Sequence, residues 1–583
     1  MAGEITAEAL FKEFQSVQLS EFFRKNRQFL GYVGKIKSLT TVIHELVTNS
    51  LDACEEAGIL PDLRVIVEEL GVEHYKITCQ DNGPGIPETH LEKVFGQLLT
   101  GTKFHRNIQL RGQQGLGVSG AVLFSQITTG QPSRIKSGTG KGTVVDAMIE
   151  MDIKTNSPKI ISKNVEHDSW RGTRVESEFK GVQYSKGSKG PFEYVRWTAA
   201  SNPHAKIYFK DPAGSEIVFE RVIDKIPQTP KEIKPHPEGL EAHDLLDLAH
   251  KSTARQVSTF LTTELARVSS QKVTEMEDII NKDMIRDYLV AAGISKESAE
   301  TQAASITPKE WTEKHADKPL FDTRRSPKRI EWKDAEHLVN AFKKTKFMAP
   351  PSSGLIPIGQ KTVEKALTNL LAPDFVEAIT RNPTVYKGGI PFMVEAAIAY
   401  GGNSGREGAE GGRKVELMRF ANRAPLLFDA GGCALNKSME SIDWKRYHIM
   451  DMDHAPVTVF INLVSTHVPY TSAGKQAIAE EDEVVAEVRF ALMQIARTLQ
   501  KFLSGKRRAS ERNAKKKLFE KYIPETAKAI SKLSGAKEED LRKNLEKIVL
   551  DRFGKEFAGG EPEEEETAAY EEIPEEIEEE AEE

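Results

Sequence analysis

The residues in front of a glycine-rich stretch at 111–126 constrain the fold of this chain more than any other feature. The stretch reads RGQQGLGVSGAVLFSQ and contains G-x-G-x-x-G at Gly115, Gly117 and Gly120. A dinucleotide-binding unit needs a buried strand directly before these glycines and a helix after them. Residues 103–114 are polar and basic instead, so the sequence argues against a dinucleotide-binding fold.

The elements upstream of the glycines come in the order helix, strand, strand. A helix is predicted from Leu39, with Ser38 as its cap, to just before Gly58, because apolar residues recur there at helical spacing. Strands are predicted at 63–70, at 74–80 and between 144 and 219, helices between 240 and 306, and a long amphipathic helix at 482–503. This order predicts an α+β protein with several domains.

Charge is distributed unevenly along the chain. The whole chain has a net charge of −7, but residues 561–583 contain 14 glutamates and no lysine or arginine, so the rest carries +7. We expect the acidic segment to be disordered, because like charges repel and little apolar surface can be buried. The basic remainder permits nucleic-acid binding.

Composition also bears on the compartment. The chain has three cysteines without metal-ligand spacing, no run of about 18 apolar residues, and a first segment that does not resemble a secretion signal. We therefore expect a cytoplasmic protein that does not span a membrane.

Three polar residues of the first helix, Glu45, Asn49 and Asp52, are spaced to share one helical face. A carboxylate and a carboxamide one turn apart can hold a hydrated Mg²⁺ and orient a water, since Mg²⁺ takes only one or two protein ligands besides waters and phosphate oxygens. Taken alone, the same residues could form an ordinary solvated face.

Two later segments offer complementary groups. In QDNGPGIP, Asp81 ends a strand and can accept a hydrogen bond from an adenine amine, while Gly83 and Gly85 let a flat ring approach the backbone. The alternative for this segment is a plain hairpin turn. In RGTRVESEF, Thr173 places a hydroxyl at the start of a strand near the same base.

The glycine-rich stretch itself is interpreted as a phosphate cradle. Thr102 and Lys103 open a polar, glycine-punctuated segment that ends where an apolar run begins at Val118. Backbone N–H groups at such a helix N-terminus favour anions. Much later, Lys475 stands on a loop before a helix, where a lysine is a good point-charge partner for a terminal phosphate. The alternative for Lys475 is an ordinary surface lysine.

Together, E-x-x-x-N-S-x-D-A, D-N-G-x-G and G-x-x-G-x-G in this order resemble the GHKL ATPases over about residues 30–220. The resemblance implies a Bergerat fold, a two-layer α/β sandwich that binds and hydrolyses ATP with Mg²⁺. It makes Glu45 the general base and Asn49 the metal ligand, and it lets Asp81 read adenine. It assigns nucleotide contacts to Asn49, Asp52, Asp81, Gly83, Gly85, Thr102, Lys103, Gly112, Gln113, Gln114, Gly115, Leu116, Gly117, Val118 and Thr173.

Two other motifs suggest chemistry that we do not expect. His44 beside Glu45 mimics the phosphoacceptor of a histidine kinase, but in kinases that motif lies on an earlier domain, so we expect a structural histidine. Asp451 and Asp453 mimic the metal-binding D-x-D of a Toprim domain, which needs a further acid in its own fold. A nucleophilic tyrosine for DNA cleavage does not stand out either.

A closer resemblance covers about residues 8–510. EFFRKNRQFLGY, HELVTNSLDACEEAGILP, GQQGLGVSGA, IDWKRYHI and VPYTSAGKQAIAEE resemble the B subunits of archaeal DNA topoisomerase VI. The resemblance implies an N-terminal dimerisation strap at 1–30, an ATPase domain at 31–228, a helix-two-turn-helix domain at 229–306, and an α/β transducer domain related to ribosomal protein S5 domain 2 at 307–505. A basic helical extension at 506–556 and an acidic tail at 557–583 match no family motif.

The same resemblance implies a function. It implies an ATP-dependent homodimer that captures duplex DNA and works in an A₂B₂ heterotetramer with a separate, DNA-cleaving A subunit. Lys475 would contact the γ-phosphate. Trp444, Lys445, Arg446 and Tyr447 would contact DNA; the alternative for this segment is an ordinary hairpin. The rival functions are an Hsp90-like chaperone and a MutL-like DNA repair clamp.

Overall fold

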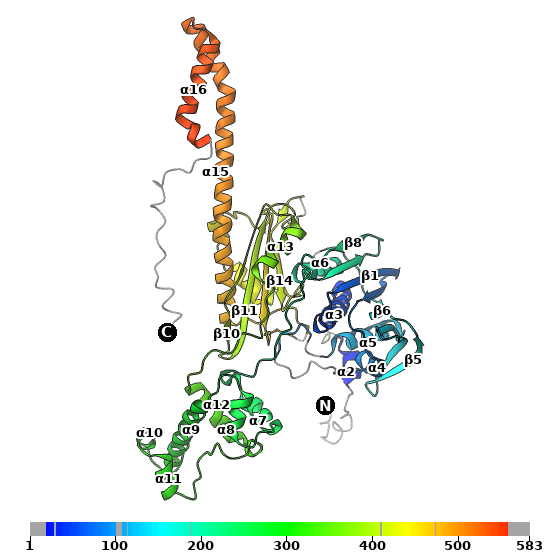
Figure 1. The fold of residues 1–583 in the computed structure, drawn as a ribbon, viewed down its shortest axis with the longest axis vertical. Coiled ribbons are helices and arrows are strands. Elements are labelled where there is room, and N and C mark those ends of the chain that lie inside the picture. Colours follow the sequence, from blue (N-terminus) through cyan, green and yellow to red (C-terminus); the bar gives the residue numbers. More distant parts are fainter. Residues whose placement is uncertain are drawn as a thin grey trace, which may run out of the picture. The chain divides into compact units, whose positions relative to one another are not determined.

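The computed structural model of the chain describes residues 19–27, 31–100, 108–112, 115–187, 189–408, 411–472 and 474–557 (Figure 1). Most of the predicted strap, Thr102, Lys103, Gln113, Gln114 and the acidic segment lie outside these residues. The chain divides into two compact units, Met1–Ala496 and Arg497–Glu583.

The N-terminal part of the first unit is built on an eight-stranded sheet with the strand order β5-β4-β3-β6-β2-β1-β7-β8. The strands are β1 Asp62–Gly71, β2 His74–Gln80, β3 Ser133–Thr139, β4 Val144–Asp152, β5 Ser157–Glu166, β6 Arg171–Lys180, β7 Lys206–Lys210 and β8 Glu216–Phe219. Only the pairing of β1 with β7 is parallel. The antiparallel pairing of β2 with β6 places the last residue of β2, Gln80, opposite Arg174 near the start of β6.

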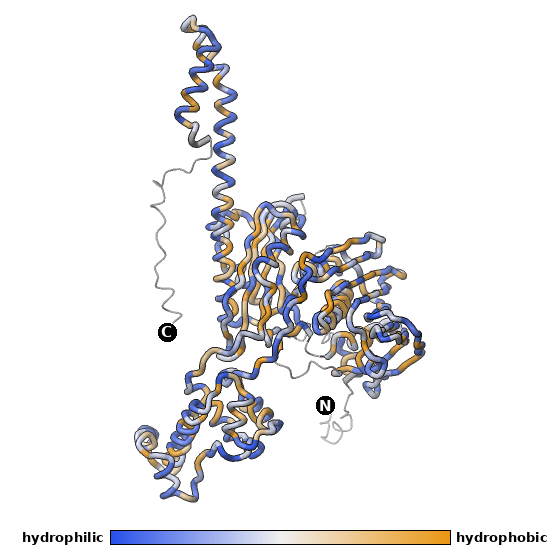
Figure 2. Tube along the Cα trace, viewed as in Figure 1, coloured by the Kyte–Doolittle hydropathy of each residue, from blue (hydrophilic) through white to orange (hydrophobic). Residues whose placement is uncertain are grey.

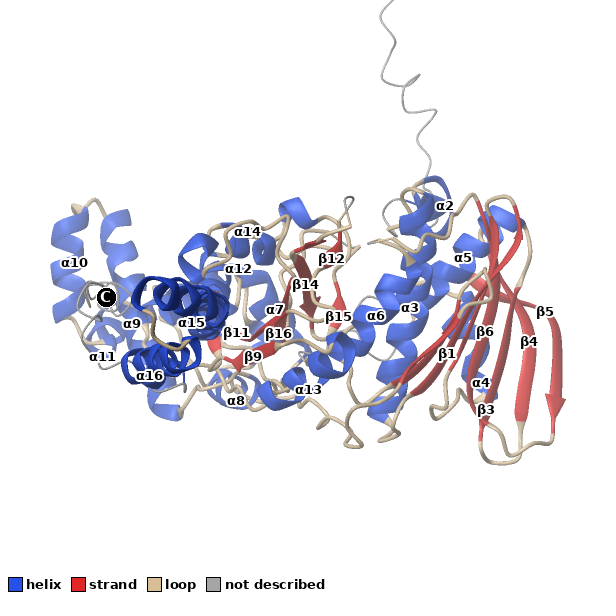
Figure 3. Cartoon of the chain, turned by 90° about the horizontal axis from the view of Figure 1, so that it is seen from above, coloured by secondary structure: helices blue, strands red, loops and turns tan. Residues whose placement is uncertain are grey.

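Helices cover one face of this sheet (Figure 3). They are α3 Lys35–Glu56, α4 Glu88–Gly96, α5 Gly117–Thr129 and α6 Pro191–Ser201. The predicted two-layer α/β sandwich is confirmed. The predicted start of α3 is wrong: the helix begins at Lys35 with Gly34 as its N-cap, and Ser38 is buried inside it. Gly34 has a φ of 74°, which a glycine adopts without strain and which lets the chain enter the helix one turn earlier.

A second sheet in the same unit has the order β10-β11-β16-β14-β15, with β9 also paired to β11. Its strands are β9 Phe375–Thr380, β10 Thr384–Tyr386, β11 Ile390–Tyr400, β14 Glu416–Ala421, β15 Ala424–Pro425 and β16 Val457–Ser465. Every residue of β16 is buried, as expected for a strand covered on both faces. Trp197 on α6 packs against Phe420 on β14 with ring centroids 5.7 Å apart, so the cores of the two sheets are continuous.

A helical cluster lies between the two sheets in sequence. It consists of α7 Ala242–Lys251, α8 Val257–Glu264, α9 Ser270–Ala291, α10 Lys296–Ser305, α11 Pro308–Lys314 and α12 Trp332–Lys344. The side chains of Leu245, Phe260, Leu338 and Phe342 are fully buried in one hydrophobic cluster, so α12 packs with the helices before residue 306.

The second unit is a helical hairpin. Helix α15, Asp482–Ser534, runs into it without a break, and α16, Glu538–Phe557, folds back along α15. Phe519 and Phe553 pack with ring centroids 5.2 Å apart. The structure extends the predicted helix 482–503 far beyond its expected end.

Among the described residues, no helix is long and apolar enough to cross a membrane.

Candidate nucleotide-binding site

Helix α3 presents the first group of predicted site residues. Its buried face, including Leu39, Val42 and Ile43, fixes the helix on the sheet. The Glu45 side chain is half-buried at the edge of this face, and Asn49, one turn later, is exposed. The Asn49 amide donates to the Glu45 carbonyl at 2.6 Å, which leaves its own amide oxygen able to bind another partner.

Asp81, at the end of β2, is held by three donors. The backbone N–H groups of Gly83 and Thr173 donate to its Oδ1 at 2.9 and 3.0 Å, and the Ser50 hydroxyl donates to its Oδ2 at 2.9 Å. Burial raises the pKa of Asp81, and the three hydrogen bonds oppose that rise. An ionised carboxylate offers about four lone-pair sites, so Oδ2 can accept one more hydrogen bond, such as one from an amine of a bound base.

Glycines allow the backbone around Asp81 to pack closely. Gly172 has a φ of 138°, and a Cβ there would lie 2.1 Å from the Asp81 carbonyl oxygen. Gly85 has a φ of 71°, and a Cβ there would lie 2.0 Å from the Gly138 carbonyl oxygen. The structure therefore brings Asp81, Gly83, Gly85 and Thr173 together, as the sequence predicts.

The glycine-rich stretch leads into α5, whose N-terminus lies directly against Glu45. A Cβ on Gly117, the first residue of α5, would lie only 2.0 Å from the Glu45 Oε2 atom. Gly115 has a φ of 58°, and Leu116 is the N-cap of the helix. The unpaired N–H groups of a helix N-terminus attract anions, so the carboxylate and an anion-binding backbone lie side by side.

The predicted phosphate contact Lys475 comes from the loop after β16, more than 300 residues further along the chain. The structure places its ammonium group 3.4 Å from the carbonyl oxygen of Arg111, which precedes Gly112 in the glycine-rich stretch. Lys475 is half-buried and has a φ of 51°. The loop after β16 therefore places the Lys475 ammonium group at the edge of the site that α3 and α5 form.

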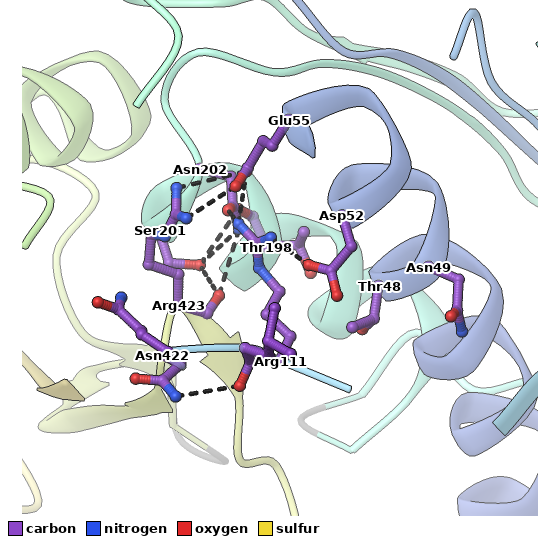
Figure 4. A network of polar contacts seen from close by, with 12 residues as sticks. Thr48, Asn49, Asp52, Glu55, Arg111, Thr198, Ser201, Asn202, Asn422 and Arg423 are labelled. Carbon is purple, nitrogen blue, oxygen red and sulfur yellow. Dashed lines mark hydrogen bonds and ion pairs between the residues drawn. The ribbon is translucent and has the colours of Figure 1, made fainter. Parts of the chain in front are cut away.

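A buried ion-pair network, which the sequence did not predict, lies beside this site (Figure 4). Arg111 donates to Asp52 and to Glu55 on α3, each at 2.6 Å. Arg423, in the turn between β14 and β15, donates to the other oxygen of Glu55 at 2.8 Å. Burial would raise the pKa of Glu55, but the Arg111 and Arg423 guanidinium groups outweigh it and hold that pKa well below its usual range.

Amide side chains complete the network. Asn202, which follows α6, accepts from Arg111 at 2.5 Å, and Asn422 donates to the Leu110 carbonyl at 3.0 Å. Asn422 and Arg423 both adopt a positive φ, 47° and 68°. This is a backbone conformation that costs free energy for residues other than glycine. The predicted nucleotide contact Asp52 is thus a buried partner of Arg111. The only signal in the sequence was the position of Arg111, directly before Gly112.

Comparison with known proteins agrees with this geometry. Residues 34–153 match the family described as "Histidine kinase-, DNA gyrase B-, and HSP90-like ATPase", and residues 350–516 match "Topoisomerase VI B subunit, transducer". The chain is 46% identical to the B subunit of type 2 DNA topoisomerase 6 from Thermococcus sibiricus, over 94% of this chain and 97% of that protein. The corresponding protein of Pyrococcus horikoshii is 46% identical over 93% and 96% of the two chains. The chain belongs to the B-subunit family of type 2 DNA topoisomerase 6.

Solved structures are more distant. The ATPase region of Saccharomyces cerevisiae topoisomerase II is 11% identical, covers 84% of this chain and 98% of that chain, and has a TM-score of 0.37. The family assignment rests on the sequence relatives.

Membership in the topoisomerase 6 B-subunit family fits a structural role for His44. Its ring is buried and packs edge-to-face on Tyr194, with centroids 5.3 Å apart. Burial lowers its pKa, and the positive charge of Lys475 lowers it further, while Glu45 has the opposite effect. A neutral, packed imidazole supports α3 beside Glu45.

The W-K-R-Y segment of this family member forms a short 3₁₀ helix, Trp444–Tyr447. Both aromatic rings are buried, and the Trp444 indole N–H donates to the Met439 carbonyl at 3.0 Å. Lys445 and Arg446 are exposed. The rings therefore anchor the segment, and only its two cations face outward.

The residues around α3 fit a hydrated Mg²⁺ bound with ATP. Mg²⁺ prefers oxygen ligands and keeps several waters, and the exposed Asn49 amide oxygen offers one such ligand beside the Glu45 carboxylate. Gly117 lets the Glu45 carboxylate lie directly beside the N-terminus of α5, whose backbone N–H groups favour phosphate oxygens.

Proposed function

We propose that this chain is the ATP-binding and ATP-hydrolysing subunit of a type II DNA topoisomerase. It dimerises on ATP binding, captures a duplex DNA segment and drives double-strand passage with a separate A subunit that cleaves DNA. One observation carries the proposal: Lys475 from the second sheet reaches the carbonyl of Arg111 at the base of the glycine-rich stretch. A nucleotide between α3 and that stretch would lie within reach of both sheets.

The proposed roles follow from the geometry. Asp81 accepts a hydrogen bond from the adenine amine, and its three protein donors hold it in position. Gly83, Gly85 and Thr173 shape the base pocket. Residues Gly112 to Val118 supply backbone N–H groups to the phosphates, and Thr102 and Lys103 contact them as well. Of these, Thr102, Lys103, Gln113 and Gln114 lie outside the described residues. Positioning and charge stabilisation provide most of the rate gain in such a reaction.

Glu45 is the proposed general base. Its carboxylate is half-buried beside the N-terminus of α5, where it can take a proton from a water aligned with the terminal phosphate. Asn49 holds the metal, and a bound Mg²⁺ would neutralise charge on the phosphate oxygens. Lys475 contributes a point charge to the terminal phosphate.

The coupling to movement must come from different ATP affinities of the open and dimerised states. The Arg111, Glu55 and Arg423 contacts join the glycine-rich stretch, α3 and the second sheet. We propose that they transmit the state of the nucleotide to the transducer, whose last helix begins at Asp482.

The proposed partners are a second copy of this chain, duplex DNA and an A subunit in an A₂B₂ heterotetramer. Residues 1–30 would form the strap between the copies. Lys445 and Arg446 would contact DNA phosphates, with Trp444 and Tyr447 as their support. We also propose that the helical domain ends near Lys344 instead of residue 306, because Leu338 and Phe342 share its core.

The test compares the chain with its Glu45→Ala variant. The wild-type chain should hydrolyse ATP faster with duplex DNA and, mixed with an A subunit, relax supercoiled plasmid. The variant should bind ATP and dimerise but lose hydrolysis. An ATP hydrolysis rate that duplex DNA does not change would indicate a chaperone. DNA binding without relaxation of the plasmid would indicate a repair clamp. Normal hydrolysis by Glu45→Ala would disprove the general-base role.

A further inference from the structure

In the helical hairpin of the second unit, the positive charge lies on one helix and not on the other. Residues 506–537 contain eleven lysines and arginines against three glutamates, a net charge of +8. Helix α16 carries five basic and six acidic residues, so its net charge is close to zero. The positive charge is therefore concentrated on the distal part of α15, where Figure 2 shows hydrophilic residues with apolar ones between them.

This positive charge is on the surface. Lys506, Arg507 and Arg508 are exposed, as are the successive lysines Lys515, Lys516 and Lys517 and, further along, Lys521, Lys528, Lys532 and Lys537. Arg507 pairs with Glu511, which lies 2.9 Å away and one turn later. We call the exposed side of 506–537 the basic face. Such a face is a binding surface for a polyanion, because the potentials of closely spaced like charges add.

The hairpin brings the following segment of the chain back to this face. Phe553, near the end of α16, packs on Phe519, which lies next to the Lys515–Lys517 cluster in sequence. Residue 506 is 13 residues before Phe519, and Ser534, the last residue of α15, is 15 residues after it, which correspond to about 20 and 23 Å along the helix. Phe553, four residues before the end of α16, therefore lies beside the middle of the basic face.

That segment is the acidic one. Residues 561–583 contain 14 glutamates and no basic residue. Its 23 residues can span roughly 75 Å when extended, more than the whole basic face. Being tethered a few residues from the face gives it an effective concentration of the order of millimolar.

We propose that the acidic segment 561–583 docks on the basic face of α15 within the same chain and covers it. The recognition is electrostatic: glutamate carboxylates line up along exposed ammonium and guanidinium groups, as phosphates would. The docked segment keeps other polyanions, duplex DNA included, off this face until they compete for it. The proposal involves neither ATP nor the nucleotide site, so its failure and that of the proposed ATPase function are distinguishable.

The experiment uses the full chain and a variant in which all 14 glutamates of 561–583 are replaced by glutamine. The probe is a fluorescein-labelled peptide of residues 561–583, and its binding is measured by fluorescence anisotropy at low salt without ATP. The glutamine variant, whose basic face is uncovered, should bind the peptide at least about tenfold more tightly than the wild-type chain, and added salt should weaken the binding. Equal affinity of both chains for the peptide would overturn the proposal.

Charge reversal locates the contact. In the glutamine variant, the triple change Lys515→Glu, Lys516→Glu and Lys517→Glu should abolish peptide binding. The matched control, Lys543→Glu, Lys547→Glu and Arg552→Glu on α16, makes the same change in net charge and should leave it intact. Circular dichroism checks that both triple variants keep their helices. If the α15 triple variant binds the peptide as tightly as the α16 triple variant does, the acidic segment docks elsewhere and the proposal is overturned.

A short duplex DNA probe provides the second readout. Removing the negative charge of the acidic segment should strengthen DNA binding, and most of that gain should disappear when the α15 triple change is added. If the gain persists undiminished, the segment acts by general repulsion and does not dock on the basic face.

Discussion

Arg423, which is buried, and Glu55, which is half-buried, form an ion pair across 368 residues of sequence, with the guanidinium 2.8 Å from the carboxylate. Glu55 lies near the end of the helix that carries Glu45 and Asn49, and Arg423 lies in a tight turn of the second sheet. Because Arg111 shares the same carboxylate at 2.6 Å, a change at the glycine-rich stretch alters the surroundings of both sheets. These contacts join α3, the glycine-rich stretch and the second sheet, and they are the ones that we propose transmit the state of the nucleotide.

Replacing Arg423 should weaken that connection. Arg423→Met removes one partner of Glu55, which keeps Arg111, so we expect a loss of about 1–3 kcal/mol in the free energy of unfolding. A double-mutant cycle with Glu55→Gln should show a coupling energy between the two positions. DNA stimulation of ATP hydrolysis should fall more than basal hydrolysis. Additive effects in the cycle would show that the pair does not connect the sheets.

Lys475 should matter for the nucleotide-dependent state more than for folding. Its side chain is half-buried, and methionine keeps a flexible apolar chain of similar length there, so Lys475→Met should cost little stability. ATP-dependent dimerisation, followed by light scattering, should weaken roughly tenfold, as expected for the loss of a charge-assisted contact of about 1.5 kcal/mol. Lys437→Met, which removes an exposed lysine on α14 Ala434–Glu440, is the control and should dimerise normally. Unchanged dimerisation of Lys475→Met would exclude the phosphate contact.

A methyl group at the start of α5 should impair hydrolysis. Gly117→Ala places a Cβ 2.0 Å from Glu45 Oε2, so either the carboxylate or the helix end must move. We expect kcat to fall about 100-fold or more, since a misplaced catalytic group costs this much. Gly71→Ala, whose Cβ would meet nothing within 4 Å, is the matched control and should retain normal kcat. Full activity of Gly117→Ala would mean that Glu45 and α5 are not adjacent during catalysis.

Asp81→Asn should separate nucleotide recognition from stability. Asparagine can accept from the Gly83 and Thr173 N–H groups with its oxygen and donate to the Ser50 hydroxyl, but it then presents an N–H where adenine needs an acceptor. ATP should bind about 10- to 150-fold more weakly, which calorimetry can measure. Asp224→Asn, at an exposed position, should bind ATP as the wild type does. Undiminished ATP affinity of Asp81→Asn would argue against its role in adenine recognition.

The difference in stability between Asp81→Asn and the wild type should depend on pH. Burial raises the pKa of Asp81 in the folded chain above its ordinary value of 3.8, so the folded state binds the proton more tightly than the unfolded state. The contribution of protonated Asp81 to the free energy of unfolding is fully present below pH 3.8. It is lost as the pH rises through the folded-state pKa of Asp81. Thermal unfolding across this range should show Asp81→Asn gaining stability relative to the wild type as the pH rises. A pH-independent difference would contradict the raised pKa.

The W-K-R-Y segment should divide into DNA contacts and structural anchors. The double change Lys445→Ala and Arg446→Ala should leave the melting temperature unchanged and lower the slope of log K for DNA against log salt by about 2, because two phosphate contacts are lost. Trp444→Ala should instead destabilise the chain by about 3–5 kcal/mol, since the ring is buried. Lys361→Ala with Lys365→Ala, on α13 Gln360–Leu371, is the control for the loss of two exposed charges. An unchanged salt slope would remove Lys445 and Arg446 from the DNA interface.

The groups whose placement depends on local spacing could be predicted from the residues alone. The spacing of Glu45 and Asn49 depends only on helical periodicity, and the turn after Asp81 depends only on the backbone freedom of Gly83 and Gly85. The family motifs then predicted the two-layer ATPase fold and the transducer. Residue type and short-range spacing carry this information, so it can be read without coordinates.

Contacts between residues that are distant in the sequence could not be predicted in this way, because they depend on how the chain packs. Asp52 shares the helical face of Glu45, yet it pairs with Arg111, and nothing local to Glu55 indicates that Arg423 will reach it. Trp444 and Tyr447 have the composition of a DNA-stacking surface, but their rings fill the core beneath the segment. Side-chain partners and burial follow from how the sheets pack against each other, and long-range packing leaves no periodic signal in the chain.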